Sequence, residues 1–384
     1  MASDDSKSNL PVALVWGDDE FSVKQRARQI FQQWSANSPG LDHEIIDANV
    51  TNSGDALTAL AKLREALQTL PFFGSGKVIW FQNCSFLGDE RTANARAVTE
   101  ALASSAQELK SFSWTNVRLL ISAGKIDKRK SFYKTLEKIA AVESFAGWTT
   151  EDRNWSAEAE NMVRRQVRAL KKQMSQEAVA RLVTLVGPNA RQLHNEAEKA
   201  ALYVGDRAEI NTEDVESIVS RNKHSRAFAL GDALGARDLP RALRTLDEEL
   251  WEMKTDSRKS EIGLLYGLIS KLRVMIFLKE MQREGWLKAE SDYPRFKLQL
   301  ERVPANSLPD DRRFNPLAMN PYVLFKALEH AGNYTLAELV RSMELLLQCN
   351  QRLVFSSLDE AMVLQEALAQ IIRRPVHPAP SAKT

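Results

Sequence analysis

Between residues 11 and 148, short apolar runs alternate with segments whose apolar residues recur at helical spacing. The runs are rich in β-branched and aromatic residues, which is typical of buried strands. We expect strands at 12–16, 44–47, 78–81, 117–122 and 142–145, and helices at 21–34, 54–69, 92–109 and 131–139. Strands separated by helices form βαβ units. The pattern therefore predicts an α/β domain with a parallel sheet and helices on both faces.

A short loop, residues 70–76, separates the second expected helix from the third expected strand. Pro71 ends the helix, because proline lacks an N–H and disfavours α geometry in the residue before it. Two glycines after Phe72 and Phe73 permit a tight turn. The sequence therefore places these two aromatic residues on a loop between two regular elements.

Two interpretations of Phe72 and Phe73 stay open at this point. Both rings could fold back into the core of the domain. Alternatively, they could form a protruding wedge that fills a pocket on a partner. Burying one phenylalanine is worth roughly 1.5–3 kcal/mol, so an exposed pair can anchor an interface.

After residue 148 the strand signals cease and the periodicity is helical. A first group, 149–223, is expected to hold helices at 155–175, 175–186 and 190–203 and one that Asn211 or Thr212 caps. A second group, 224–372, is expected to hold helices at 226–234, 239–252, 258–283, 319–330, 335–355 and 357–372. Several prolines make 285–318 partly irregular, and the tail 373–384 is expected to be disordered.

Composition narrows the class of protein. A chain of 384 residues is expected to form two or three domains. The formal charge of +2 is too small to predict nucleic-acid binding over the whole surface. Cys84 and Cys349 are the only cysteines, which argues against a disulfide framework or a zinc site and fits a reducing cytosol. The polar N-terminus is unlike a signal peptide, and Lys271 and Arg273 interrupt the most apolar stretch, so we expect a cytoplasmic protein without a membrane span.

Many α/β domains of this kind bind nucleotides, but the sequence lacks the motifs that would hold a nucleotide phosphate or magnesium. A phosphate-binding loop needs GxxxxGK followed by Ser or Thr. Lys77 is followed by Val78, and Lys125 is followed by Ile126. The turn at 17–20 is acidic, and no expected strand ends in an Asp-Glu pair that would hold magnesium. We therefore expect no catalytic site, cofactor or metal in this chain.

At this point the chain resembles the delta subunit of the bacterial DNA polymerase III clamp loader, an AAA+-like family. Single motifs are weakly specific, but their order and spacing run along most of the chain. The matching segments are 15–21 (VWGDDEF), 70–74 (LPFFG), 119–130 (LLISAGKIDKRK), 187–203 with its NEAEK helix, and 228–234 with 242–243. Beyond about residue 258 only the helical character matches.

The resemblance implies three domains: an AAA+-like domain at 1–148 without a functional phosphate loop, a helical lid at 149–223 and a helical collar at 224–372. It implies that Leu70, Phe72 and Phe73 bind the sliding clamp as a hydrophobic wedge and that the collar assembles a ring with other clamp-loader subunits. The implied function is opening of the clamp for loading on primed DNA during replication, as an accessory subunit of the polymerase holoenzyme.

Contact with primer–template DNA is a further expectation. A basic cluster follows the fourth expected strand: Lys125, Lys128, Arg129, Lys130 and Lys134. A second basic cluster follows one helix face: Arg164, Arg165, Arg168, Lys171 and Lys172. Either cluster could instead be a solvated surface. Two rival functions also stay open, an AAA+ ATPase with a degenerate nucleotide site and a helical nucleic-acid-binding scaffold without a clamp partner.

Overall fold

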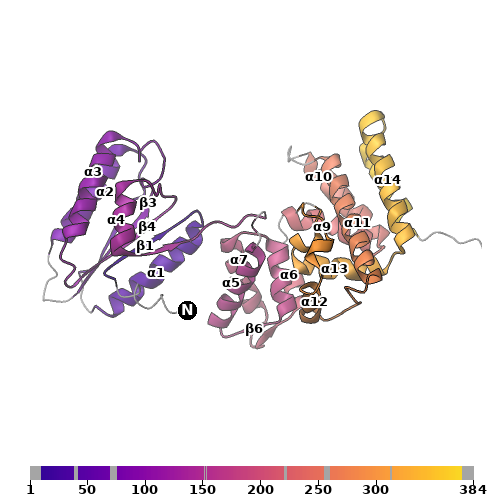
Figure 1. The fold of residues 1–384 in the computed structure, drawn as a ribbon, viewed down its shortest axis with the longest axis horizontal. Coiled ribbons are helices and arrows are strands. Elements are labelled where there is room, and N and C mark those ends of the chain that lie inside the picture. The colour runs from indigo at the N-terminus through magenta and orange to yellow at the C-terminus, as the bar shows by residue number, and fades with distance from the viewer. Residues whose placement is uncertain are drawn as a thin grey trace, which may run out of the picture. The chain divides into compact units, whose positions relative to one another are not determined.

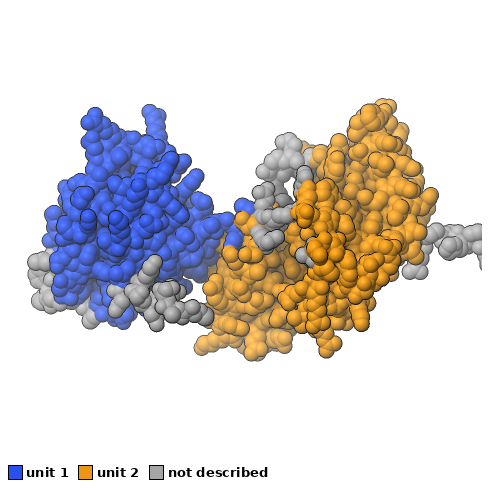
Figure 2. Space-filling model, in the orientation of Figure 1, with its two compact units in different colours: residues 1–149 blue, residues 150–384 orange. Residues whose placement is uncertain are grey.

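The computed structural model describes residues 10–38, 42–69, 76–150, 152, 154–219, 223–254, 260–311 and 314–373, without the side chains of 223–228 and 305. The chain divides into two compact units, Met1–Thr149 and Thr150–Thr384, which Figure 2 colours separately. Leu70, Phe72 and Phe73 lie outside the described residues, and so does almost all of the predicted tail.

Unit 1 contains a parallel five-stranded sheet in the order β2-β3-β4-β1-β5. Its strands are β1 (Val12–Trp16), β2 (Glu44–Asp47), β3 (Lys77–Cys84), β4 (Val117–Ala123) and β5 (Ala140–Ser144). Val12 pairs with Leu119 on one side and with Ala140 on the other, so β1 lies between β4 and β5. The parallel sheet confirms the α/β class expected for the N-terminal part.

Helices cover both faces of this sheet, as alternate strand residues require. Ala13 and Val15 pack with Trp80 and the apolar side of α1 (Glu20–Ala36). Val12 and Leu14 point to the opposite face, which carries the larger cluster. That face is covered by α2 (Ser53–Gln68), α3 (Arg96–Ser111) and α4 (Ser131–Ile139).

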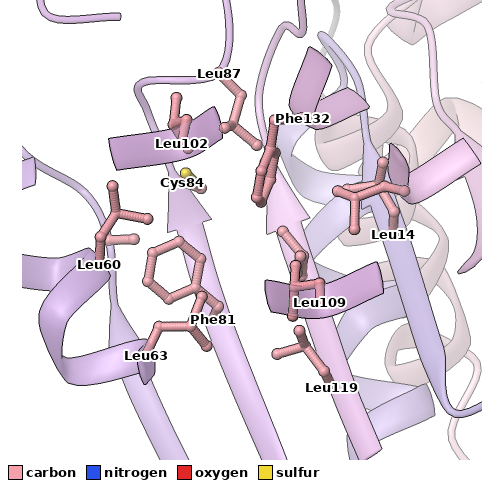
Figure 3. Packing of buried hydrophobic residues seen from close by; sticks show 14 of the residues in the cluster. Leu14, Leu60, Leu63, Phe81, Cys84, Leu87, Leu102, Leu109, Leu119 and Phe132 are labelled. Atoms are coloured by element: carbon pink, nitrogen blue, oxygen red, sulfur yellow. The ribbon is translucent and has the colours of Figure 1, made fainter. Parts of the chain in front are cut away.

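Figure 3 shows the larger cluster of unit 1 from close by. The ring of Phe81, on β3, lies beside Leu60 and Leu63 of α2, and it meets Phe86 edge to face at 6.2 Å between ring centroids. Phe81 is 1% exposed. Burial of an aromatic side chain stabilises the folded state by roughly 1.5–3 kcal/mol, so this contact holds α2 against β3.

Some predicted boundaries in unit 1 were wrong. The third helix begins at Arg96 rather than at residue 92, because 91–94 form a turn in which Asn94 N–H donates to the Glu90 carbonyl. Strand β3 continues to Cys84, beyond the predicted end at 81. Strand β5 begins at Ala140, directly after α4, and ends at Ser144.

Unit 2 opens with α5 (Trp155–Ala169), α6 (Gln176–Val186), α7 (Ala190–Tyr203) and α8 (Thr212–Ile218). Asn211 caps α8 and forms a reciprocal capping box with Asp214, which decides between the two predicted caps. The expectation of helices alone was wrong here. Gln173–Met174 and Glu209–Ile210 form a short parallel pair, β6 and β7, and so α5 ends before the predicted residue 175.

The rest of unit 2 is helical: α9 (Lys223–Gly235), α10 (Leu239–Met253), α11 (Glu261–Arg283), α12 (Tyr293–Leu300), α13 (Pro321–Gly332), α14 (Leu336–Phe355) and α15 (Glu360–Ile372), with two short 3-10 turns at Ala305–Ser307 and Pro316–Ala318 (Figure 1). Helix α12 was missed in the segment predicted to be irregular. Pro294 lies in its first turn, where the missing N–H costs nothing.

Contacts within unit 2 join its early and late helices. Ala180 of α6 belongs to the same buried cluster as Tyr293 and Phe325. The separate lid and collar therefore stay predictions, as does the boundary between them. In the part of the chain that the structure describes, no helix is both long enough and apolar enough to cross a membrane.

Candidate functional site

The described residues give the two ends of the predicted wedge loop. Helix α2 ends at Gln68 with Thr69 as its C-cap, and β3 begins at Lys77. Thr69 N–H and Thr69 Oγ1 both donate to the Glu65 carbonyl, at 3.0 and 2.8 Å. The helix end before the loop is therefore closed by its own backbone and side-chain hydrogen bonds.

The end of α2 and the start of β3 form the frame of the loop, and the Lys77 side chain is buried between them. This side chain is 2% exposed, and its Nζ lies 2.9 Å from Glu44 Oε1 on β2. The same ammonium donates to the carbonyls of Ala66 at 2.7 Å and Thr69 at 3.5 Å. A buried lysine needs such partners to compensate its desolvation. The cation also complements the negative end of the α2 dipole.

The start of β3 is held by two further contacts. Lys77 N–H donates to the Asn116 carbonyl at 2.7 Å, and Val78 N–H donates to His43 Nδ1 at 3.2 Å. A Cβ added to Gly76 would lie only 2.9 Å from Ser38 Oγ. The chain at Gly76 therefore passes close to its neighbours, and the described residues on either side of the loop, Thr69 and Gly76, both lie in the sheet domain.

The turn after β1 occupies the position where a phosphate loop would lie in a nucleotide-binding α/β domain. Gly17 has a φ of 150°, and a Cβ there would lie 1.9 Å from the Phe145 carbonyl oxygen. Asp19 caps α1 by accepting a hydrogen bond from Ser22 N–H at 3.2 Å, and Glu20 lies in the first turn. Negative side chains at this helix start oppose binding of a phosphate there.

Four members of the first basic cluster lie between β4 and α4, and Lys134 lies on α4. The members differ in whether other groups of the chain already bind their side chains. Arg129 forms a bidentate pair with Asp127, with both contacts at 2.9 Å, and its hydrogen bonds lower the pKa of that carboxyl. Lys130 Nζ donates to the Ala93 carbonyl at 2.9 Å. Lys128 Nζ lies 5.1 Å from the Trp16 ring centroid. Lys125 and Lys134 are exposed and have no ion-pair partner among the described residues.

The second basic cluster lies on α5 and just beyond it. Arg164 pairs with Glu160 at 2.9 Å, and Lys172 donates to the carbonyls of Gly205 and Arg207. Arg168 and Lys171 are exposed. Two of the five members, Arg164 and Lys172, therefore stabilise the local fold, which favours the solvated-surface interpretation for them.

Sequence reasoning missed an exposed apolar face on α14. Val340, Leu347 and Val354 are 47%, 57% and 51% exposed, and Phe355 is 86% exposed. The first three recur every seven residues, so they lie close to one line along the helix. This spacing was visible in the sequence, but only the structure shows that the residues stay uncovered.

Comparisons with known proteins agree with the resemblance. Residues 14–145 match the family described as DNA polymerase III, delta subunit. DNA polymerase III subunit delta of Bacillus subtilis (strain 168) is 22% identical over 369 residues, which is 95% of this chain and 93% of that protein. The family match and this relative confirm the resemblance to the delta-subunit family.

Two solved structures are similar at low identity. A Bacillus subtilis DNA clamp loader delta protein has 18% identity and a TM-score of 0.43, covering 96% of this chain and 97% of that chain. A Thermotoga maritima RuvB Holliday junction branch migration motor has 12% identity and a TM-score of 0.35, covering 58% and 68%.

Proposed function

We propose that this chain is a clamp-loader subunit that binds a sliding clamp and opens it for loading on primed DNA. Leu70, Phe72 and Phe73 form the hydrophobic wedge that enters a pocket on the clamp. The observation that carries the proposal is the similarity to a DNA polymerase III subunit delta along 95% of the chain. A replication clamp-loader role is the function that this similarity supports.

The frame around the loop supports the choice of contact. A loop that must change the conformation of its partner has to be supported by rigid parts of its own domain. The support here consists of the closed end of α2 and the start of β3, joined by the buried Lys77 ammonium. Anchoring both ends of a loop lowers the ordering entropy that binding would otherwise cost.

Opening of the clamp follows from differential affinity. The wedge binds more tightly to a clamp protomer whose shape does not close well against its neighbour. Such binding shifts the ring towards its open form, whereas equal affinity for both forms would open nothing. No catalytic step by this chain is required, and other clamp-loader subunits would supply ATP-dependent control.

We assign contact with those subunits to the exposed face of α14. Val340, Leu347 and Val354 form an apolar line on a helix at the outer edge of unit 2 (Figure 1). Several exposed large apolar side chains on one side of a helix are more common at protein interfaces than on other surfaces. A ring that assembles through the C-terminal helices would cover this face.

Contact with DNA is assigned to the exposed members of the first basic cluster, Lys125, Lys128 and Lys134. Arg129 and Lys130 contribute less, because an aspartate and a backbone carbonyl already occupy their donors. Phosphate contacts of this kind make affinity fall steeply with salt concentration.

The test is capture of the purified clamp by a Phe72→Ala/Phe73→Ala variant. We expect binding to fall by several kcal/mol while the melting temperature stays close to that of the unaltered protein. Leu202→Ala/Tyr203→Ala is the matched control, because these neighbours on α7 are 75% and 52% exposed. A large loss of stability with clamp binding intact would show that the two phenylalanines belong to the core.

ATP binding by the isolated chain tests the alternative that this protein is an AAA+ ATPase with a degenerate nucleotide site. The acidic cap of α1 predicts that the isolated chain does not bind ATP at millimolar concentration. Saturable ATP binding by the isolated chain would favour the degenerate ATPase. A failure to capture the clamp in the presence and absence of ATP would favour the nucleic-acid-binding scaffold.

A further inference from the structure

A cavity of about 190 Å³ lies inside unit 2, where α6 meets α9, α10, α11 and α13. Much of its wall is apolar and includes Leu185, Val274 and Val323. A purely apolar cavity of about 150 Å³ is known to bind benzene. The space in this unit therefore suits one ring-sized apolar group that carries a small substituent.

The charged side chains of the wall are mostly cations. Arg181, Arg241, Lys271 and Lys326 line the cavity, and Asp232 is the only acidic residue among the lining residues. Lys271 pairs with Asp232 at 2.8 Å, and Arg181 lies 3.0 Å from Glu216. Arg241 has no ion-pair partner among the described residues. Lys326 pairs with Glu329 at 2.8 Å, so within the described part of the chain Arg241 is the lining cation whose charge is left to attract an anion.

The hydroxyl of Tyr322 is a second polar group of the wall that has no partner among the described residues. This lining residue is 1% exposed, and its hydroxyl has no hydrogen-bond partner within the described part of the chain. The Arg181 guanidinium carbon lies 5.9 Å from the Tyr322 ring centroid. Buried hydroxyls are normally hydrogen-bonded, so the Tyr322 hydroxyl has a donor available for an acceptor bound in the cavity that this residue lines.

We propose that this cavity binds a small organic anion, a ring-sized apolar body with one carboxylate or phosphate group. The body packs against Leu185 and Val323. The anionic group pairs with Arg241 and accepts a hydrogen bond from Tyr322. Both kinds of anionic group fit the donors of the wall, and the experiment below separates them. The proposal does not depend on the clamp-loader function.

Occupancy has a structural consequence. The walls come from α6 on one side and from α10, α11 and α13 on the other. A ligand that contacts both sides binds only the packed arrangement, so it stabilises the folded state in proportion to the logarithm of its concentration. A rise in melting temperature with ligand concentration is therefore a second readout of binding.

The experiment titrates the full chain with phenyl phosphate and, separately, with benzoate, followed by calorimetry and by melting temperature. We expect one saturable site for at least one of the two. The comparison of the two affinities identifies the preferred anionic group. Phenol has the apolar ring without the anionic group, and inorganic phosphate has the anionic group without the ring. Both are expected to bind at least tenfold more weakly.

Two variants with matched controls locate the site. Arg241→Gln is expected to weaken binding about tenfold or more, which corresponds to about 1.4 kcal/mol. Arg244→Gln, an exposed cation on the same helix, is expected to change nothing. Gly267 is an exposed lining residue where an added Cβ meets no atom within 4 Å, so Gly267→Leu narrows the open side of the cavity and is expected to weaken binding. Gly332→Leu adds the same side chain at an exposed helix end.

Clear outcomes would overturn the proposal. One is the absence of a saturable site for both anions up to about 10 mM. Another is unchanged affinity in a folded Gly267→Leu protein or in Arg241→Gln. Should Gly267→Leu fail to fold, Tyr322→Phe replaces it, because this change keeps the ring and removes only the hydroxyl. Unchanged affinity in Tyr322→Phe would equally contradict the assignment.

Discussion

The Nζ of Lys77 lies 2.9 Å from Oε1 of Glu44, so the first residue of β3 is tied to the first residue of β2. The same ammonium reaches the carbonyl of Ala66 in α2. One buried cation therefore joins two strands and a helix at the base of the loop that carries Phe72 and Phe73. This contact links the stability of unit 1 to the proposed action on the clamp.

Replacement of Lys77 tests that link. Lys77→Met keeps much of the side-chain volume but leaves the Ala66 and Thr69 carbonyls without their donor. We expect the free energy of unfolding to fall by about 1–3 kcal/mol, as measured by urea denaturation. We also expect weaker capture of the clamp at temperatures where the variant is fully folded.

Glu44→Gln is the matched control for Lys77. The side chain of Glu44 is 44% exposed, so loss of its charge removes a screened ion pair but leaves both carbonyl contacts in place. Its effect on stability and clamp binding should be smaller than that of Lys77→Met. Full clamp binding by a folded Lys77→Met protein would mean that the frame does not support the wedge.

The exposed face of α14 makes a separate prediction. Leu347→Glu places a charge in the middle of the apolar line and should weaken assembly with the other clamp-loader subunits by at least tenfold, because an unpaired charge would be buried in the interface. Size-exclusion chromatography of the reconstituted complex measures this. Leu202→Glu, on an exposed position of α7, should assemble normally. If Leu347→Glu and Leu202→Glu assembled equally well, α14 would not be part of the interface.

Two exposed lysines, Lys125 before α4 and Lys134 on α4, predict a change in salt dependence. Lys125→Gln/Lys134→Gln should lower the slope of the logarithm of primer–template affinity against the logarithm of salt concentration by roughly 1 for each lysine. Lys110→Gln, an exposed lysine in the last turn of α3, serves as control. An unchanged slope in the double variant would show that these lysines do not contact phosphates.

His330 predicts how stability depends on pH. Burial, together with the nearby Lys271, lowers the pKa of His330 to about 4. The unfolded chain binds this proton at about pH 6.5, so between pH 6.5 and 4 the unfolded state holds more protons than the folded state. Stability should therefore be complete above pH 6.5 and fall as the pH drops towards 4.

Denaturant titrations from pH 7 to pH 4 test the role of His330. In His330→Gln, which cannot be protonated, this part of the pH dependence should flatten even though the variant is less stable at pH 7. Tight packing explains that loss, since the His330 ring lies where a Cβ on Gly235 would stand. An identical slope in the variant would assign the pH dependence to other groups.

Local patterns sufficed for most of unit 1. Strands with apolar residues on both faces are buried wherever they occur, so Val12–Trp16 and Val117–Ala123 were recognisable from composition alone. Helices with one apolar side were recognisable from their period. Boundaries were less accurate, because helix ends depend on turns such as that at 91–94, which no periodicity describes.

The frame of the candidate site was not predictable in the same way. In the sequence, Lys77 was noted only because Gly76-Lys77 resembles the end of a phosphate-binding motif, which the following Val78 does not match. The partners of Lys77, Glu44 and Ala66, lie 33 and 11 residues away. The pairing of β2 with β3 brings Glu44 close, and the packing of α2 on the sheet brings Ala66 close. The placement of Phe72 and Phe73, as core residues or as a wedge, stays a prediction because both lie outside the described residues.

Sequence periodicity is a property of neighbours along the chain, and so it predicted the alternating strands and helices of unit 1 and most helices of the remainder, but not the β6–β7 pair. Contacts between distant segments depend on how elements pack. Packing put Arg241 and Tyr322 beside one cavity, left the α14 face uncovered and buried the Lys77 ammonium, because each of these results from a balance of burial and pairing between residues that no local pattern connects.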